Sequence, residues 1–219
     1  MVFLVNKQWL AITLIGWVII VACSWIIPLP TLATKFIWMA LQQAWLILAG
    51  LKAIQPKKLM QFELAKLFSG IRAGLVLFVL NTAISYVVVL ILSLIFGMEE
   101  VLMVLANERS GIGQLFAVKN QITLVIVFFL VVIGAPVSEE IVFRGGLLQG
   151  LAQVTSARVA NFITALIFAL VHYYVIQFLP VFFSGLYLGW IYLKRENLVE
   201  PIAAHATVNF IGFMFNLFI

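Results

Sequence analysis

Three charged side chains lie inside one of the most apolar regions of the chain. The segment GAPVSEEIVFRGG, residues 134–146, places Glu139, Glu140 and Arg144 directly after the run ITLVIVFFLVVI. Charged groups inside a membrane are energetically costly, so they usually mark a functional site. The alternative is an ordinary helix start at a membrane surface, where Ser138 caps the helix and first-turn glutamates suit the helix dipole.

The spacing within this segment divides its charged groups into two kinds. Glu140 and Arg144 are four positions apart with the acid first, which is the favourable order for an ion pair on a helix. Glu139 is five positions from Arg144 and therefore points about 140° away from it on a helix of 3.6 residues per turn. Glu139 is thus left without a cationic partner, which suits a general base that works near neutral pH.

Both histidines of the chain lie downstream in apolar segments. His172 in FALVHYY follows Phe168 by one helical turn, so the Phe168 ring is placed to orient the imidazole and exclude water. His205 and Asn209 in AAHATVNF are four positions apart and present an imidazole and a carboxamide to one point. Two such groups can hold a developing oxyanion or ligate a metal. The alternatives are a packing role for His172 and interhelical hydrogen bonds for His205 and Asn209.

The combination of a carboxylate, an imidazole and an oxyanion clamp indicates a hydrolase. Other classes are excluded by residues that the chain lacks. It has no aspartate, which excludes an aspartyl intramembrane protease. A single cysteine, Cys23, allows neither an intramolecular disulfide nor a metal site built from cysteines, and two histidines are too few for a three-histidine zinc site.

The composition predicts a membrane protein. Of the 219 residues, 65% are hydrophobic and 10% are charged, which is more apolar surface than a water-soluble domain needs. We expect an all-α, polytopic transmembrane helical bundle of about seven helices, because no alternating strand pattern competes with the long apolar runs. The expected helices span residues 9–27, 33–54, 73–96, 122–136, 158–178, 181–193 and 201–218. An alternative for the fourth is one long helix over residues 122–153, bent at Pro136 and at the Gly145–Gly146 pair.

One integral membrane domain is expected, with N-terminal transmembrane helices and loops in residues 1–120 and the catalytic core in residues 121–219. The basic loop 52–72 contains the amphipathic stretch KKLMQFELAKLF, which suits a membrane surface, and the mildly acidic loop 97–120 is expected to hold a short amphipathic helix. Because basic loops stay on the cytoplasmic side, the N-terminus and loop 52–72 are expected there, with loop 97–120 outside. The net charge of +5 then reflects loops that face anionic lipid, and no nucleic-acid partner is expected.

Three short motifs occur in order in the C-terminal half. EEIVFR fits E-E-x-x-x-R, FALVH fits F-x-x-x-H and HATVN fits H-x-x-x-N. Together they resemble the CPBP (Abi) family of intramembrane proteases, related to the CAAX prenyl endopeptidase Rce1. The resemblance implies an α-helical membrane endopeptidase that uses a glutamate-activated water. It assigns Glu139 as the base, His172 as the group that orients the water, His205 and Asn209 as the oxyanion site, and Glu140, Arg144 and Phe168 as supporting residues.

The resemblance also bears on substrates, cofactors and partners. Eukaryotic members trim prenylated C-terminal tripeptides, whereas bacterial members include bacteriocin maturation and self-immunity proteins. The helix number and loop sequences look bacterial, so we expect a multi-pass protein of the bacterial plasma membrane. It would cleave a membrane-associated peptide or protein that is not prenylated, without a cofactor, zinc being the alternative. The second hypothesis is a non-catalytic membrane adaptor or bacteriocin self-immunity protein with a membrane-protein partner. The third is a proton-coupled transporter, although no inverted repeat supports it.

Overall fold

The structure is a computed structural model that describes residues 4–116 and 120–218. Every regular element in this part of the chain is helical, which confirms the predicted all-α fold. The helices are α1 Lys7–Ile26, α2 Leu32–Ala53, α3 Pro56–Leu59, α4 Leu64–Phe96, α5 Met98–Phe116, α6 Gln121–Val127, η1 Phe128–Gly134, α7 Ala135–Glu140, η2 Ile141–Leu148, α8 Gln149–Ala152, α9 Ala157–Leu170, α10 Phe178–Arg195 and α11 Val199–Phe218.

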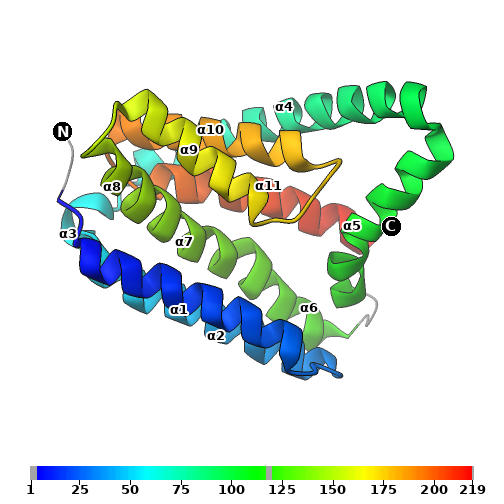
Figure 1. The fold of residues 1–219 in the computed structure, drawn as a ribbon, viewed down its shortest axis with the longest axis horizontal. Helices are drawn as coiled ribbons and strands as arrows, with labels where there is room; N and C mark the ends of the chain where they lie inside the picture. The colour runs from blue at the N-terminus through cyan, green and yellow to red at the C-terminus, as the bar shows by residue number, and fades with distance from the viewer. Residues whose placement is uncertain (1–3, 117–119, 219) are drawn as a thin grey trace.

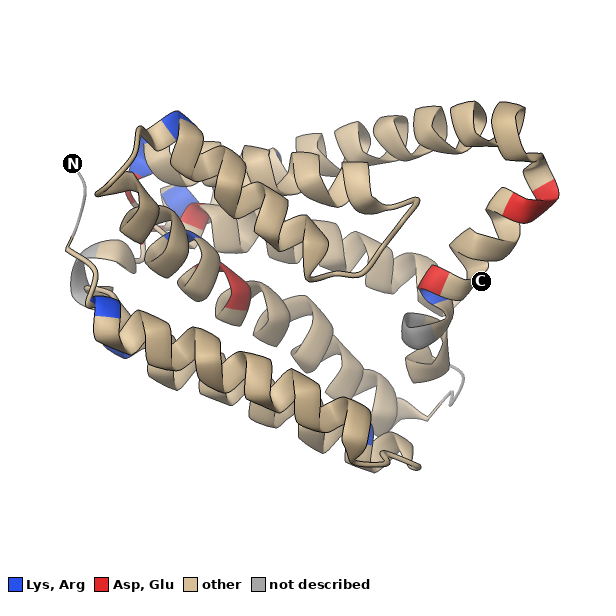
Figure 2. Ribbon diagram, in the orientation of Figure 1, with Lys and Arg blue, Asp and Glu red and all other residues tan. Residues whose placement is uncertain are grey.

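The segments from α6 to α8 form one continuous helix over Gln121–Ala152. The expected helix end at residue 136 is therefore wrong, and the alternative of one long helix is correct. Pro136 is accommodated because η1, which precedes it, is π-helical: the Ala135 N–H donates to the carbonyl of Leu130, five residues back. Figure 2 shows the acidic segment Glu139–Glu140 midway along this helix, far from either end.

Five helices in the described part are long and apolar enough to cross a membrane by length and composition: α1, α2, α4, the long helix 121–152 and α11. The apolar helix α9 has only 14 residues. At 1.5 Å per residue it would cover roughly 21 Å, less than a typical hydrocarbon core. The chain is an integral, multi-pass membrane protein.

The long helix 121–152 runs through the middle of the bundle (Figure 1). The pair α1 and α2 packs along one of its sides, and α11 packs along the other. The helix α4 lies against α11, and α9 lies against α10. The segments with the acidic motif, His172 and His205 therefore come from neighbouring elements of the bundle.

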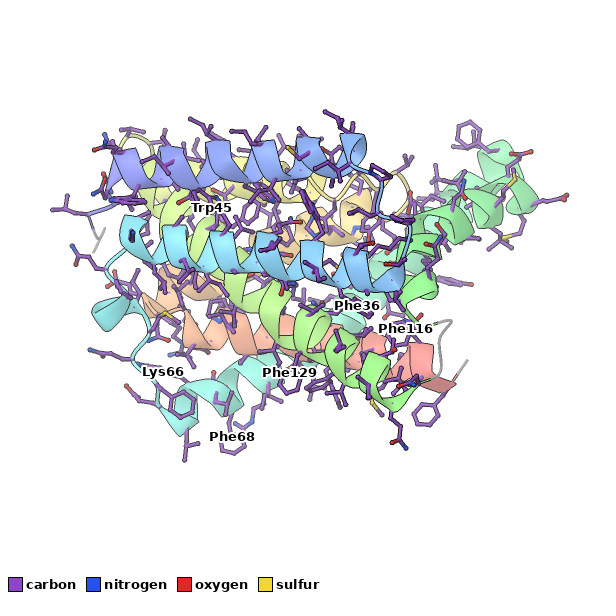
Figure 3. All side chains as sticks on the ribbon, turned by 90° about the horizontal axis from the view of Figure 1, so that it is seen from below. Phe36, Trp45, Lys66, Phe68, Phe116 and Phe129 are labelled. Atoms are coloured by element: carbon purple, nitrogen blue, oxygen red, sulfur yellow. The ribbon has the colours of Figure 1, made fainter. Side chains whose placement is uncertain are left out.

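Figure 3 shows how aromatic side chains join these elements. Trp45 of α2 lies at the junction with α1, where its Nε1 donates to the carbonyl of Thr13 at 3.0 Å. Phe36 of α2 and Phe116 of α5 lie close together and belong to one buried cluster with Phe213 of α11. This cluster places the end of α5 against the bundle.

The amphipathic stretch 57–68 covers the end of α3, Pro56–Leu59, and the start of α4, Leu64–Phe96; the side chains of Lys57 and Lys58 lie outside the described part. One N-terminal expectation is corrected. In the expected loop 97–120, α5 is a helix of 19 residues rather than a short one. Residues 117–119 of that loop lie outside the described residues.

The helix expected over residues 158–178 is also corrected, since α9 ends at Leu170. The chain turns after it, and Tyr173 has a φ of 57°, in the left-handed region. A new helix, α10, then begins at Phe178, with Pro180 in its first turn, where a missing N–H needs no helical partner. Residues 171–177, which include His172, are therefore a connecting segment.

Positive charge gathers mainly at one end of the bundle, where α1 begins and α10 ends (Figure 2). Lys7 lies in the first turn of α1, Lys52 in the last turn of α2, and Lys194 and Arg195 in the last turn of α10. A hydrogen bond of 2.9 Å from the Asn6 N–H to the Ala53 carbonyl joins the start of α1 to the end of α2.

Candidate active site

The ion pair expected from the i,i+4 spacing is present and fully buried. Arg144 Nη1 lies 2.9 Å from Glu140 Oε1, and both residues have 0% exposure. The guanidinium also donates from Nη2 to the carbonyl of Gly185 in α10 at 3.1 Å and lies 4.6 Å from the ring centroid of Phe168. A buried charge pair persists only when additional polar contacts offset the loss of hydration. Phe168, itself 2% exposed, thereby supports the pair through its ring face.

His205 is oriented by the same carboxylate. Its Nδ1 lies 3.0 Å from Glu140 Oε1. Because a carboxylate oxygen only accepts, the Nδ1 proton is donated to Glu140 and the ring orientation is set by this bond. The opposite nitrogen, Nε2, faces Glu139 Oε2 at 4.0 Å, which is too long for a hydrogen bond. The two glutamates thus hold different roles: Glu140 anchors His205, and Glu139 faces its free nitrogen.

Glu139 is the acidic residue of this segment that takes no part in the ion pair between Glu140 and Arg144. Its side chain is 23% exposed, and among the described residues its Oε2 has no hydrogen-bond partner. Glu140 Oε2 and Arg144 Nε also have no partner there, so what distinguishes Glu139 from Glu140 is that Glu140 bonds Arg144 and His205.

His172 lies in the connecting segment, one residue beyond Val171, the C-cap of α9. Its Nδ1 is 2.6 Å from the carbonyl oxygen of Phe168, so Nδ1 carries the proton and donates. The Nε2 atom is then an acceptor in the neutral ring. The Phe168 ring lies 4.6 Å from the imidazole, centroid to centroid. The expected contact between Phe168 and His172 is therefore present, although the helix ends before His172.

Asn209 is held by an irregularity of the long helix. Its Nδ2 donates to the carbonyl of Val131 at 2.9 Å. The usual helical donor to that carbonyl is Ala135 N–H, which bonds Leu130 instead, and Pro136 has no N–H. The π-helical turn thus leaves one carbonyl for a side chain of α11 to satisfy. One amide proton of Asn209 is used in this way, and the second is available to a ligand.

All four residues predicted to be catalytic line one cavity of about 390 Å³: Glu139, His172, His205 and Asn209. This volume falls within the range of ordinary small-ligand sites. Tyr174 lines it too, and burial, reinforced by the carboxylates of Glu108 and Glu139, raises the pKa of its phenol, which stays protonated. A second cavity of about 220 Å³, lined by Gln42 and Gln43 of α2, shares Glu139 and His172 with the first.

Three features of the site were not predicted. One is Glu108 of α5, whose carboxylate accepts the backbone N–H groups of the segment before α10. Glu108 Oε1 lies 2.6 Å from the Val175 nitrogen and 2.8 Å from that of Ile176. Oε2 lies 3.2 Å from the Gln177 nitrogen. A carboxylate at this helix start suits the helix dipole and fixes the segment that carries His172. No local pattern signals a contact between residues 67 positions apart.

A second missed feature is the close packing of α4 against α11. A Cβ at Gly70 would come within 2.5 Å of the Glu200 carbonyl, and one at Gly74 would come within 2.5 Å of the Ala204 carbonyl. The two glycines are four positions apart in GIRAG, a small-xxx-small pattern that brings membrane helices together. The pattern is visible in the sequence and positions the α11 turn that carries His205.

A third is Gln43 of α2, which binds the same irregular turn as Asn209. Its Nε2 donates to the carbonyl of Leu130 at 2.8 Å. The N-terminal helices therefore contact the site even though they carry none of the three motifs. The sequence feature that could have indicated this contact was a polar glutamine within an apolar helix.

Two comparisons with known proteins found a match. Residues 121–211 match the family model described as type II CAAX prenyl endopeptidase Rce1-like. UPF0177 protein YxdF of Lactococcus lactis subsp. lactis (strain IL1403) is 35% identical over 81 residues, which cover 35% of this chain. The match spans 42% of the relative, less than half of its length. No solved structure matches the chain. The matched range, which is less than half of the chain, contains every predicted site residue from Glu139 to Asn209, and residues 121–211 are thus similar to the Rce1-like family of CAAX prenyl endopeptidases.

Proposed function

We propose that this protein is an intramembrane endopeptidase that hydrolyses a peptide bond of a membrane-associated peptide or protein through a water activated by Glu139. One observation carries this proposal: Glu139, whose Oε2 has no hydrogen-bond partner among the described residues, lines one cavity together with both histidines and Asn209. A base, an orienting imidazole and donors for an oxyanion around one cavity are the parts that peptide hydrolysis needs.

In the proposed reaction Glu139 accepts a proton from a water molecule, and the water oxygen bonds to the carbonyl carbon of the substrate. His172 accepts a hydrogen bond from the same water at Nε2, because its Nδ1 proton is held by the Phe168 carbonyl. The second amide proton of Asn209 stabilises the developing oxyanion. His205 joins it by donating from Nε2 when its ring is doubly protonated. Glu139 then passes its proton to the leaving nitrogen as the C–N bond breaks, which yields a carboxyl group and an amine.

The proposed substrate is a membrane-associated peptide or protein that is not prenylated. The family description names CAAX prenyl endopeptidases, and the curated relative is a bacterial protein whose name assigns no activity. We place the protein in the bacterial plasma membrane with the N-terminus in the cytoplasm. The basic residues at the end of the bundle where α1 begins support this orientation through the positive-inside rule.

The reaction is proposed to need no metal. The donor set supports this, since no group of three or more His, Cys, Asp and Glu side chains within the described residues is arranged to hold an ion. Elemental analysis of the purified protein tests the point. Stoichiometric zinc that is lost in His205→Ala would show that the mechanism is metal-dependent.

The decisive experiment compares purified wild-type protein with Glu139→Gln and His205→Ala in detergent. The probes are internally quenched peptides that end in a CAAX sequence, with and without a farnesyl group, and membrane peptides analysed by mass spectrometry. We expect cleavage by the wild type and loss of at least about 10²-fold in each variant, with unchanged folding. A cellular phenotype that survives both substitutions would instead support a non-catalytic adaptor.

A further inference from the structure

Two amide side chains in the wall of the same cavity have no role in the reaction described above. Asn81 belongs to α4, and Gln177 is the N-cap residue of α10. Both line the cavity that contains Glu139. Among the described residues, neither Asn81 Oδ1 nor Gln177 Nε2 has a hydrogen-bond partner, although both atoms are buried. One is an acceptor and the other is a donor.

The orientation of the Asn81 amide is fixed by a serine. Its Nδ2 donates to Ser184 Oγ at 2.7 Å, and the Ser184 hydroxyl donates in turn to the Pro180 carbonyl at 3.0 Å. Because the single hydroxyl proton of Ser184 is used on Pro180, Ser184 can only accept from Asn81. A flipped amide would place two acceptors against each other. The atom of the Asn81 amide without a partner is therefore Oδ1, which is a hydrogen-bond acceptor.

The Gln177 amide contacts a second serine, which belongs to α4. Ser85, one helical turn after Asn81, donates its hydroxyl to Gln177 Oε1 at 3.2 Å. In this arrangement Nε2 is the end of the amide that has no partner among the described residues. The backbone of Gln177 is held as well, since its N–H donates to Glu108 Oε2 at 3.2 Å. Both side chains are thus positioned before any ligand binds.

An acceptor and a donor on one wall match a specific chemical group. A residue of an extended peptide directs its N–H and its C=O to the same side, which is how a strand pairs with another strand. Proteins that bind extended peptides obtain affinity from these main-chain bonds. A buried acceptor and donor left unpaired cost free energy, which a peptide backbone would recover.

We propose that Asn81 Oδ1 and Gln177 Nε2 form a backbone-binding pair for one residue of an extended peptide in the cavity. The peptide N–H donates to Asn81, and the carbonyl of the same residue accepts from Gln177. The inference rests on the proposed function, because it describes how the substrate of that reaction is held. Such a pair tolerates many side chains, since it contacts only the main chain. It affects binding and leaves the chemical step to Glu139.

The test measures equilibrium binding, so that it does not depend on catalysis. A fluorescent peptide ending in a CAAX sequence, unprenylated or farnesylated, is titrated with the full-length Glu139→Gln protein in detergent, and anisotropy gives the Kd. A series of analogues replaces one amide at a time by an ester, which removes one N–H. We expect one ester position to weaken binding about tenfold, the size expected for one buried hydrogen bond.

The cavity variants then identify the partner of that N–H. In the Glu139→Gln background, Asn81→Leu should weaken binding of the all-amide peptide about tenfold and should abolish the penalty of the critical ester. Gln177→Met should weaken the all-amide peptide about tenfold while the ester penalty remains. The matched control is Asn216→Leu, because Asn216 lines the same cavity but donates its Nδ2 to the Gly212 carbonyl at 2.8 Å. This variant should bind every analogue as its parent does.

The outcomes separate this inference from the proposed function. If all ester analogues bind alike, or if the ester penalty survives Asn81→Leu, the backbone-binding pair is wrong even when the wild type cleaves peptides. If the pattern appears but the wild type cleaves nothing, the pair stands and the hydrolytic function fails. Binding of the ester analogues is measured on Glu139→Gln protein in which Asn81 and Gln177 are unchanged. This series therefore tests the backbone-binding pair even if a cavity variant does not fold. Absence of any peptide binding would overturn the pair.

Discussion

The imidazole Nδ1 of His205 lies 3.0 Å from Glu140 Oε1, and the same oxygen accepts the Arg144 guanidinium at 2.9 Å. One carboxylate oxygen therefore joins a local ion pair to a histidine 65 positions away in the chain. Glu140 sets the orientation of the His205 ring and turns its Nε2 toward Glu139. The neighbouring glutamates thus divide into an anchor and a reactive group, and the following predictions depend on that division.

Glu140→Gln should destabilise the protein by about 3–5 kcal/mol, because it leaves the buried Arg144 charge without its counter-charge. Thermal unfolding of the purified protein in detergent measures this effect. The double variant Glu140→Gln/Arg144→Met should recover most of the stability, since it removes both charges, but should remain inactive. A single variant as stable as the wild type would contradict the importance of this pair.

Asn209→Leu should lower kcat by about 10²–10³-fold if its free amide proton stabilises the oxyanion. It should also lower stability by about 1–3 kcal/mol, because the Val131 carbonyl loses its donor. Asn216→Leu, about two turns further along α11, serves as the control and should retain activity. The rates come from the quenched-peptide assay. A change confined to KM would assign Asn209 to substrate binding instead of the oxyanion.

Glu108→Gln should loosen the segment that carries His172, because a neutral amide offers a single weaker acceptor to three backbone N–H groups. Hydrogen exchange of the amides of Val175, Ile176 and Gln177 should accelerate about tenfold or more, and kcat should fall. Glu100→Gln on the exposed start of the same helix is the matched control. Unchanged exchange at residues 175–177 would show that Glu108 does not hold the segment.

Gly74→Ala should separate α4 from α11, because the added Cβ would meet the Ala204 carbonyl at 2.5 Å and Thr207 Cβ at 2.6 Å. Overpacking of this kind costs about 1–3 kcal/mol, and the shift would move His205, which follows Ala204. Activity should fall together with the unfolding temperature. Gly113→Ala is the control, since a Cβ there has no neighbour within 4 Å. Wild-type activity in Gly74→Ala would mean that the contact does not position His205.

Sequence reasoning found the parts of the site in which short-range helix geometry determines which side chains are neighbours. Glu140 and Arg144 pair because residues four apart on a helix are neighbours whatever surrounds them. The same rule places His205 and Asn209 on one face of α11. It also explains why the Phe168–His172 contact is present although α9 ends before His172. A turn of helix-like chain is enough to join residues four apart.

The predicted helix ends were wrong where distant groups or irregular hydrogen bonds determine where a helix ends. Pro136 suggested a helix end, but a π-helical turn bonds Ala135 to Leu130 and carries the helix past it. The end of α9 lies before the segment whose N–H groups bind Glu108, a residue of another helix. Neither event has a local sequence signature, because each depends on which backbone groups find partners in the folded bundle.

The sequence by itself determined that the chain is an all-helical membrane protein, and its three motifs pointed to the family whose model matches residues 121–211. Apolar composition and helical spacing suffice for the fold class, since lipid leaves few ways to satisfy the backbone. Only the tertiary structure decided that Glu139, His172, His205 and Asn209 line one cavity and that Glu140 anchors His205. It also decided that Asn81 and Gln177, which line the same cavity, each have an unpaired amide atom. These relationships join residues far apart in the chain, and they exist only where the helices pack.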